Sequence, residues 1–472
     1  MNVTLKQIGF WGGCSAFAGL MLFGEGSSFM AVMAIAAWML IWWITEAAPI
    51  AVTALLPLVL FPLTGTESID KVAGAYGSQY VFLFMGGFIL ALAMEKWMLH
   101  KRIALAIVSA VGTSRRRIVL GFMLATALLS MWISNTATTL MMLPIAMSVL
   151  AISNDDPGKQ RFTLNLLLGI AYAANCGGIA TLVGTPPNVA MAGILSSTFG
   201  IEVGFFDWLI IGLPFSALLL WAVYLLLTLV LNPMPAGDAA VAHDHLERER
   251  NALGKMHLEE RRVLIVFSVT ALLWMLKDAI NAAQTLVELN DSSISMLGGL
   301  ALFVVPGKKS SRLLEWSDTS ALPWGILLLF GGGMALANAL KSAGLIDRIA
   351  TYFTDSPESG LLVITASLIV ISLLLTELIS NLALVLVFVP VVGAIAEGMG
   401  LSPLQFAIPV TLAASCAFML PMATPPNAIV FAGGHIKISA MVRSGALLNL
   451  VAALLAIAFS QWAIPLWIKH FY

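Results

Sequence analysis

The sequence has few charged residues, and this scarcity limits the kind of protein that it can encode. Asp, Glu, Lys and Arg make up 10% of the 472 residues, whereas soluble domains carry roughly 25%. Apolar residues make up 60% and mean hydropathy is +0.95. Runs near the ~20 residues needed to cross a bilayer recur along the chain. These features exclude a soluble protein and predict an all-α polytopic membrane protein, and the net charge of −1 gives no support for a nucleic-acid partner.

Cysteine is also scarce, and the motifs of membrane enzymes are missing. The three cysteines form no disulfide pattern. The chain has no HExxH metal motif, no Ser/His/Asp set at one depth and no sizeable soluble domain, so an integral membrane enzyme has little support. The first apolar run lacks the basic start and small-residue cleavage pattern of a signal peptide, so we do not expect a cleaved leader.

Two motifs occur twice in this apolar chain. Ser134-Asn135-Thr136 recurs in degenerate form as Ser380-Asn381-Leu382, 246 residues later, and Thr185-Pro186-Pro187-Asn188 recurs as Thr424-Pro425-Pro426-Asn427, 239 residues later. At the 246-residue offset, the flanking residues Phe84, Gly86, Gly87, Ala137, Leu140 and Pro144 match Phe330, Gly332, Gly333, Ala383, Leu386 and Pro390. Polar and helix-breaking elements duplicated in both halves of a membrane protein indicate a transporter binding site.

The apolar runs predict helices along almost the whole chain. We expect them near residues 7–24, 29–48, 50–63, 80–99, 163–183, 186–196, 207–231, 263–284, 292–306, 318–340, 404–422, 425–434 and 442–468. The paired arms 117–133 with 137–152, and 360–379 with 382–397, are too short for comfortable separate crossings. We therefore interpret each pair as a re-entrant hairpin with its Ser-Asn motif at the tip. Each Thr-Pro-Pro-Asn segment predicts a broken helix, which survives at membrane depth only beside protein or a wet cavity.

Basic residues predict the orientation. With a cytoplasmic N-terminus, about 11 crossings and two hairpins that return to their own side, the C-terminus lies outside. This topology places nineteen of the 24 Lys and Arg residues in the cytoplasm and five outside, as the positive-inside rule requires. The first hairpin then enters from the cytoplasm and the second from outside, so the two halves are inverted repeats.

One long polar segment, 233–262, separates the halves. Its charges have mixed signs, which predicts a cytoplasmic linker helix. His243, His245 and His257 lie in it without a nearby cysteine or a closed set of ligands. We interpret them as solvated residues rather than as a metal site.

The hairpin tips have the chemistry to bind an anion and cations together. Hydroxyl and amide groups donate to carboxylates, and their oxygens accept Na⁺. Helix ends add free N–H groups for the anion and carbonyls for the cation. Arg117, at an edge, is the single basic residue in the hairpins and broken helices. An anion here needs a compensating charge, which favours symport with Na⁺ or H⁺ over anion exchange. A single Ser-Asn-Thr could instead hold helices together, but duplication with a Pro-Pro-Asn break favours a site.

Several of these motifs resemble the divalent anion:sodium symporter family. The resemblance is carried by Trp43-Ile44-Thr45-Glu46-Ala47-Ala48-Pro49, the two Ser-Asn motifs, Thr376-Glu377 and both Thr-Pro-Pro-Asn segments, and it covers nearly the whole chain. It implies a secondary active transporter, in its bacterial branch an importer of a C4-dicarboxylate such as succinate, malate or fumarate with Na⁺ across the inner plasma membrane. It also implies a homodimer in which a scaffold holds a transport domain that moves as an elevator.

The resemblance divides the chain into scaffold and transport parts. Repeat 1 would have scaffold helices at 1–100 and transport elements at 101–232, namely a hairpin at 117–152, a broken helix at 163–196 and a helix at 207–231. The linker 233–262 follows. Repeat 2 would have scaffold helices at 263–350 and transport elements at 351–472, with a hairpin at 360–397, a broken helix at 404–434 and a helix at 442–468.

The resemblance also implies a set of site residues. The first Na⁺ site is expected at Ser130, Ser134, Asn135 and Gly184, and the second at Thr376, Ile379, Asn381 and Ala423. The substrate is expected at Ser134, Asn135, Thr136, Thr185, Pro186, Ser380, Asn381, Leu382, Thr424 and Pro425. Ser130 and Thr376 each precede the motif serine by four residues, one helical turn, so their hydroxyls can reach the same ion.

Two features leave alternatives open. Leu382 replaces the threonine of the fuller motif, so a related carboxylate, citrate or sulfate could be preferred. Glu46 and Glu377 are the carboxylates deepest in apolar sequence, so each is a candidate proton carrier. We instead expect Glu377 to orient the second hairpin and Glu46 to pin a helix break beside Pro49. The alternatives to Na⁺ symport are proton coupling and anion exchange; a channel would not need inverted hairpins.

Overall fold

The structure is a computed structural model that describes residues 4–24, 27–152, 158–234, 240–308, 312–353 and 360–471. These residues form helices and connecting turns, with one isolated β-bridge between Pro306 and Arg312. Nine of the described helices or helix pairs are long and apolar enough to cross a membrane, and shorter apolar helices accompany them. The predicted all-α polytopic fold is confirmed.

The N-terminal half contains one scaffold-like group of helices followed by the elements around the first motif. The first group comprises α1 (Leu5–Phe23), α2 (Ser28–Thr45), α3 (Ile50–Thr53), α4 (Leu56–Leu63), α5 (Ile69–Tyr76) and α6 (Gln79–Lys96). The second comprises α7 (Leu99–Val111), α8 (Arg115–Ser130), α9 (Asn135–Ile152), α10 (Lys159–Ala180), α11 (Pro186–Ile194), η1 (Leu195–Phe199), α12 (Phe205–Leu225) and η2 (Leu226–Leu231). The helical hairpin α8/α9 and the broken helix α10/α11 both lie where the motifs predict them.

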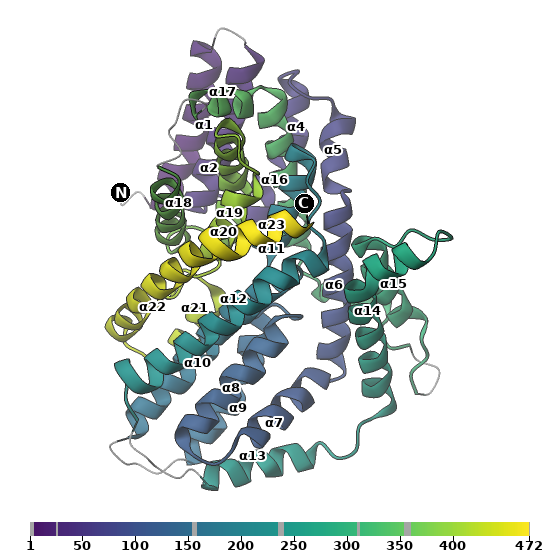
Figure 1. Cartoon of the computed structure of the whole chain (residues 1–472), viewed down its shortest axis with the longest axis vertical. Coiled ribbons are helices and arrows are strands. Elements are labelled where there is room, and N and C mark those ends of the chain that lie inside the picture. The colour runs from purple at the N-terminus through teal and green to yellow at the C-terminus, as the bar shows by residue number, and fades with distance from the viewer. Residues whose placement is uncertain are drawn as a thin grey trace.

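The C-terminal half repeats this order after the linker helix α13 (Ala240–Ala252). It begins with α14 (Leu258–Ala283), α15 (Asp291–Val304), η3 (Trp316–Ala321) and α16 (Trp324–Ser342). It continues with α17 (Leu345–Phe353), α18 (Leu361–Thr376), α19 (Asn381–Gly398), α20 (Leu404–Ala414), α21 (Pro425–Ala432), α22 (Ile438–Ala458), η5 (Phe459–Ala463) and α23 (Ile464–Phe471). In Figure 1, α7, α8 and α9 lie toward the lower end, whereas α17, α18 and α19 lie toward the upper end. The two hairpins therefore occupy opposite halves of the molecule.

The structure changes several predicted helix boundaries. The hydropathy pattern missed α5, α7 and α17, which are short helices that follow or precede the long apolar runs. The helix predicted at 404–422 ends at Ala414, and the one predicted at 318–340 begins at Trp324 after the 3₁₀ turn η3. The π-helical turns η2 and η5 begin 233 residues apart, at Leu226 and Phe459, so α12 and α22 correspond at a third offset that the motifs do not reveal.

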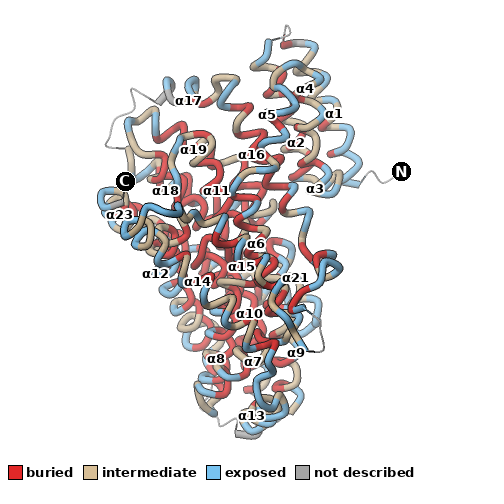
Figure 2. Tube along the Cα trace, turned by 90° about the vertical axis from the view of Figure 1, so that its right-hand side faces the viewer, coloured by how far each residue is buried: buried red, intermediate tan, exposed pale blue. Residues whose placement is uncertain are grey.

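Helix α10, the most buried of the candidate membrane spans among the described residues, fits because its second half is built from small residues. Ala173-Ala174-Asn175-Cys176-Gly177-Gly178 leaves room for direct approach of the neighbouring backbone. A Cβ on Gly177 would lie 2.2 Å from the carbonyl oxygen of Ala127 in α8, so glycine is required there. Figure 2 shows buried residues through the middle of the molecule, around α6, α10 and α11, and exposed ones on outer helices such as α1. The two broken helices thus lie inside protein, as non-helical backbone in a membrane requires.

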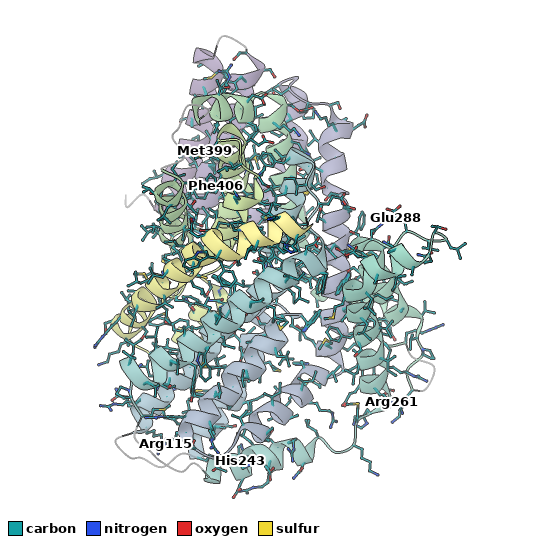
Figure 3. The ribbon with its side chains drawn as sticks, in the orientation of Figure 1. Arg115, His243, Arg261, Glu288, Met399 and Phe406 are labelled. Carbon is teal, nitrogen blue, oxygen red and sulfur yellow. The ribbon has the colours of Figure 1, made fainter. Side chains whose placement is uncertain are left out.

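Charged residues tie the linker to one end of the molecule. Arg102 in α7 forms an ion pair with Glu260, with Nε 2.7 Å from Oε2, and also donates to the carbonyls of Leu253 and Gly254. Lys101 lies 3.5 Å from Glu249 of α13. Figure 3 shows Arg115, His243 and Arg261 toward the lower end, beside α13 and the start of α14. The linker therefore packs on the end that carries the first hairpin. His245 contacts Ser148 of α9 at 3.3 Å, so it is not simply solvated.

Candidate functional site

The tip of the first hairpin brings two predicted cation ligands into contact. Helix α8 ends at Ser130 and α9 begins at Asn135, so residues 131–134 form the turn. The Ser130 hydroxyl donates to Asn135 Oδ1 at 2.6 Å, and Ser134 Oγ accepts from the backbone N–H of Ala137 at 3.2 Å. Ser134 thereby caps α9, which is the role that serine prefers at a helix start.

The first helix break supplies further oxygens beside this tip. Asn188, the last residue of Thr-Pro-Pro-Asn, donates its amide to the carbonyls of Gly178, Ile179 and Thr181 at 3.2, 3.3 and 2.8 Å. It thereby holds the start of α11 against the end of α10. A Cβ on Gly184 would lie 2.6 Å from the Gly178 carbonyl and 3.1 Å from that of Met131. The predicted ligand Gly184 is therefore a glycine because the oxygens around it leave no room for a side chain.

The second hairpin tip repeats the first with a threonine. Thr376 ends α18 and Asn381 begins α19. The Thr376 hydroxyl lies 2.8 Å from Asn381 Oδ1, as Ser130 does from Asn135, and it also donates to the carbonyl of Ala414 at the end of α20. The hydroxyl–amide pair of the motif is thus present twice, and the second copy adds a direct bond to its broken helix.

The motif asparagine also stabilises the second break through hydrogen bonds, and a residue of helix α10 from the first repeat contacts the same break. Asn427 donates to the carbonyls of Ala417 and Leu420, each at 3.1 Å. Asn175, a buried residue of α10, donates to Thr424 Oγ1 at 3.2 Å and to the Ala417 carbonyl at 3.4 Å. Asn175 therefore joins the second break to α10, the helix that leads into the first break.

Glu377 fixes the unwound part of the second break. Its carboxylate accepts the backbone N–H groups of Phe418, Met419 and Leu420 at 2.9, 2.9 and 3.0 Å, and the amide of Asn449 in α22 at 2.8 Å. Buried N–H groups outside a helix need acceptors, and this carboxylate provides them. These bonds explain why α20 ends at Ala414 rather than near 422. The expectation that Glu377 orients the second hairpin region agrees with this geometry.

Several carbonyl oxygens at the predicted cation positions have no donor. No hydrogen bond within the described residues reaches the carbonyls of Gly184, Ile379 or Ala423. Free carbonyls and hydroxyls are the hard oxygen ligands that alkali cations accept. Among the same residues, no cluster of three or more His, Cys, Asp or Glu side chains could hold a metal ion. The oxygen set suits a weakly bound monovalent cation rather than a resident transition metal.

Predicted substrate residues supply free donors. The hydroxyls of Thr136, Thr185 and Ser380 have no hydrogen-bond partner among the described residues. The same holds for the first two N–H groups of each hairpin helix, those of Asn135 and Thr136 in α9 and of Asn381 and Leu382 in α19. Unpaired N–H groups at a helix start bind anions. Pro186 and Pro425 stand at the starts of α11 and α21, where they remove N–H groups. The donors therefore come from the two hairpin helices more than from the broken ones.

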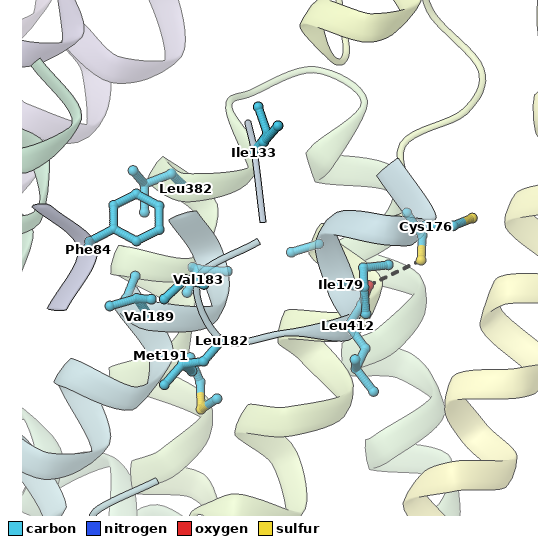
Figure 4. Packing of buried hydrophobic residues seen from close by; sticks show 14 of the residues in the cluster. Phe84, Ile133, Cys176, Ile179, Leu182, Val183, Val189, Met191, Leu382 and Leu412 are labelled. Carbon is cyan, nitrogen blue, oxygen red and sulfur yellow. Dashed lines mark hydrogen bonds between the residues drawn. The ribbon is translucent and has the colours of Figure 1, made fainter. Parts of the chain in front are cut away.

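Leu382 is placed differently from its counterpart Thr136. It is 5% exposed and belongs to the buried cluster that includes Phe84 and Val183, drawn in Figure 4. Thr136 is only half-buried. The second tip thus replaces a hydroxyl by packed apolar surface, and the polar groups that remain there are Ser380 and Asn381.

Glu46 does not lie in this region. It ends α2 in the left-handed conformation, with φ of 48°, and its carboxylate lies 3.7 Å from Lys6, both side chains being mostly exposed. It does mark the break between α2 and α3, as expected. The one side-chain partner of Glu46 among the described residues is Lys6, which belongs to neither hairpin tip, so proton carriage by Glu46 finds no structural support.

Sequence reasoning missed several residues that hold the site. Asn188 and Asn427 recur in both repeats, so their duplication could have revealed them. Asn175, Thr181 and Asn449 align with Ala414, Leu420 and Ser216, so no repeat search finds them. The one signal in the sequence is that each is a polar side chain in an apolar segment. Such a side chain is energetically unfavourable inside a membrane and therefore indicates a functional or structural role.

Comparison with known proteins identifies a family of transporters. The family described as "Sodium:sulfate symporter transmembrane region" matches residues 26–468. A protein of Staphylococcus saprophyticus named sodium-dependent dicarboxylate transporter SdcS is 38% identical over 450 residues, which cover 92% of this chain and 86% of that protein. The protein of the same name from Staphylococcus aureus is 37% identical over 451 residues with the same coverage.

Two solved structures share the fold at low sequence identity. The YdaH transporter of Alcanivorax borkumensis matches with a TM-score of 0.57 and 15% identity, over 83% of this chain and 86% of that one. MtrF of Neisseria gonorrhoeae matches with a TM-score of 0.56 and 12% identity, over 86% and 84%. The duplicated motifs, the helical fold and the family match over most of the chain lead to one conclusion: this multi-pass membrane protein belongs to the sodium:sulfate symporter family, the divalent anion:sodium symporters that its motifs resemble.

Proposed function

We propose that the protein is a secondary active transporter that imports a C4-dicarboxylate together with Na⁺. One observation carries the proposal: each hairpin tip pairs a hydroxyl with a motif asparagine, at Ser130–Asn135 and Thr376–Asn381, beside a broken helix with a free carbonyl. Such oxygen sets suit Na⁺, and free N–H groups and hydroxyls between them suit a carboxylate. The name of the relatives that are 37–38% identical supports this choice of cation and substrate.

The two cation sites have the following composition. The first comprises Ser130, Ser134, Asn135 and Gly184, and the second comprises Thr376, Ile379, Asn381 and Ala423. The substrate lies between them, within reach of Thr136, Thr185 and Ser380. Because no Lys or Arg lies at either tip, the bound cations supply the positive charge that a dicarboxylate needs inside the membrane.

Glu377 holds the second break in this proposal. Its carboxylate accepts four N–H donors, three from the unwound backbone and one from Asn449, and it belongs to neither proposed cation site. We therefore assign Glu377 a positioning role, and proton coupling becomes the alternative that the experiment below excludes or selects.

The larger organisation follows the same proposal. The helices α7–α12 and α18–α23 form the transport part, and α1–α6 and α14–α17 form the scaffold of a homodimer. The N-terminus is cytoplasmic and the C-terminus external. The linker end supports this orientation, since Arg115 and Arg261 gather there with α13. Each hairpin is re-entrant, and the transport part moves against the scaffold as an elevator.

Uptake into proteoliposomes tests the proposal. With labelled succinate outside, we expect an inward Na⁺ gradient to drive accumulation, and a proton gradient or preloaded succinate to have little effect. A thermal-shift titration supplies the binding arm: succinate should raise the melting temperature more with Na⁺ than with choline, because a ligand of the folded state stabilises it. Uptake that requires a preloaded anion and ignores Na⁺ would refute symport.

A further inference from the structure

The two repeats make the same inter-helix contact to different degrees. Gly333 in α16 faces Leu386 in α19 so closely that a Cβ on Gly333 would lie 2.3 Å from Leu386 Cδ2, and Leu386 is fully buried. The equivalent residues 246 positions earlier are Gly87 and Leu140. Leu140 is 55% exposed, and a Cβ on Gly87 would meet Val183 at 3.5 Å instead. Helix α16 therefore packs directly against the second hairpin at this position, whereas α6 makes no equivalent contact with Leu140 of the first hairpin.

A cavity marks the place where the first contact is missing. It has a volume of about 340 Å³ and is lined by Glu95, Met98, His100, Ile133, Ala137, Thr138, Leu140 and Met141. Its walls therefore come from the α6–α7 corner and from the first hairpin, next to the Ser134-Asn135-Thr136 motif. The cavity thus lies beside the first hairpin tip.

Charged residues stand at the equivalent corners of the two repeats. Lys341, near the end of α16, donates from Nζ to the carbonyl of Thr198 in η1, the far end of the first broken helix. Glu95 holds the same position in α6, 246 residues earlier, and lines the cavity. The Glu95 carboxylate has no hydrogen bond or ion pair among the described residues, although the Glu95 backbone carbonyl accepts the N–H of Met98. The two corners lie near α7 and α17, toward opposite ends of the molecule in Figure 1.

The position equivalent to Thr198 carries a cation. Thr198 lies 13 residues beyond Thr185, and Lys437 lies 13 residues beyond Thr424, in the loop between α21 and α22. Lys437 is exposed and has no side-chain partner among the described residues. Donor and acceptor are exchanged between the two repeats. Lys341 donates to a carbonyl, whereas the Glu95 carboxylate is an acceptor and would need a donor such as the Lys437 ammonium.

We propose that Glu95 and Lys341 position the transport part in its two end states, with Lys341 bound to Thr198 in the state seen here and Glu95 bound to Lys437 in the opposite one. Inverted repeats exchange conformations when access alternates, so contacts made by one repeat in one state are made by the other in the next. In the opposite state Leu140 packs on Gly87, the cavity closes, and Lys341 releases Thr198. This inference rests on the proposed transport cycle.

Paired cysteines in a background without Cys14, Cys176 and Cys416 test the exchange in proteoliposomes. Glu95→Cys with Lys437→Cys should cross-link through a short bifunctional maleimide, and Lys341→Cys with Thr198→Cys should do the same. Each cross-link should abolish succinate uptake. Cross-linking of the Lys341/Thr198 pair should also leave Leu140→Cys open to a small maleimide, whereas cross-linking of the Glu95/Lys437 pair should protect it.

The matched control pairs one cysteine from each of the two corners. Glu95→Cys with Thr198→Cys should give no cross-link, because these residues belong to opposite corners. Charge reversal gives an independent measurement: Glu95→Lys should lower uptake ~fivefold or more, and adding Lys437→Glu should restore at least half of it. Absence of the Glu95/Lys437 cross-link beside a positive Lys341/Thr198 cross-link, or failure of the reversal to rescue, would overturn the proposal. If either result is obtained while Na⁺ still drives succinate uptake, the proposed function stands and only this inference fails. If the cross-links form but succinate uptake does not depend on Na⁺, the proposed function fails instead.

Discussion

The two helix breaks share a motif but are held by different chemistry. In the first, α10 stays helical to Ala180, and a neutral contact, the Thr181 hydroxyl on the Met131 carbonyl at 2.5 Å, joins the break to the hairpin tip. In the second, Glu377 stands where the first repeat has Met131, and its charge holds an unwound segment that begins five residues earlier in register. The duplicated Ser-Asn pair thus contributes to both proposed ion sites, while non-repeated neighbours determine how far the helix unwinds.

Removing the Glu377 charge should have the largest effect on this difference between the two breaks. Glu377→Gln leaves one acceptor oxygen for four donors and turns an NH₂ toward backbone N–H groups. Each hydrogen bond to a charged group contributes roughly 1.5–3 kcal/mol. We expect Na⁺-driven succinate uptake to fall at least ~tenfold and the melting temperature to drop. Met131→Gln, the matched change in the first repeat, should change uptake less than ~threefold. Equal effects of the two substitutions would show that the breaks are held alike.

The hydroxyls before each motif give a smaller and graded test. Thr376 bonds both Asn381 and the Ala414 carbonyl, whereas Ser130 bonds Asn135 alone. We expect Ser130→Ala to raise the Na⁺ concentration for half-maximal uptake ~fivefold, since a lost bond is worth roughly 1 kcal/mol, and Thr376→Val to raise it further. Thr365→Val is the control, because that hydroxyl bonds only within α18, to Leu361. A larger shift from Ser130→Ala would reverse the proposed ranking of the sites.

The third motif position sharpens the comparison on the substrate side. Leu382→Thr introduces a hydroxyl into a packed apolar cluster, so we expect a modest change, a ~two- to fivefold shift in the affinity for succinate relative to citrate or sulfate. Thr136→Leu should lower succinate affinity more, because Thr136 is half-buried and its hydroxyl is free to donate. Competition uptake measures both. Coincident competition profiles for Leu382→Thr and the parent would remove Leu382 from the residues that set selectivity.

Much of the architecture could be predicted because hydropathy and duplication are properties of the chain itself. The helical hairpins at 117–152 and 360–397 and both broken helices lie where the repeated motifs placed them. The boundary of α20 could not be predicted, because residues 415–422 are as apolar as a helix and only Glu377, 41 residues away from Phe418, removes them from it. The roles of Asn175 and Asn449 were equally hidden, since each acts on a segment of the other repeat or on a distant helix.

The sequence by itself determined that this protein is a helical membrane protein with two equivalent polar breaks, and which Ser, Thr and Asn residues line them. Those conclusions depend on local properties, namely apolar length, proline position and repetition at a fixed offset. The tertiary structure alone decided which break is held by a charge, which hairpin packs against a helix such as α16 and which corner side chain, that of Glu95 or of Lys341, has a partner. These depend on contacts between segments far apart in the chain, and the free energy of such contacts is set by burial and geometry that no local pattern encodes.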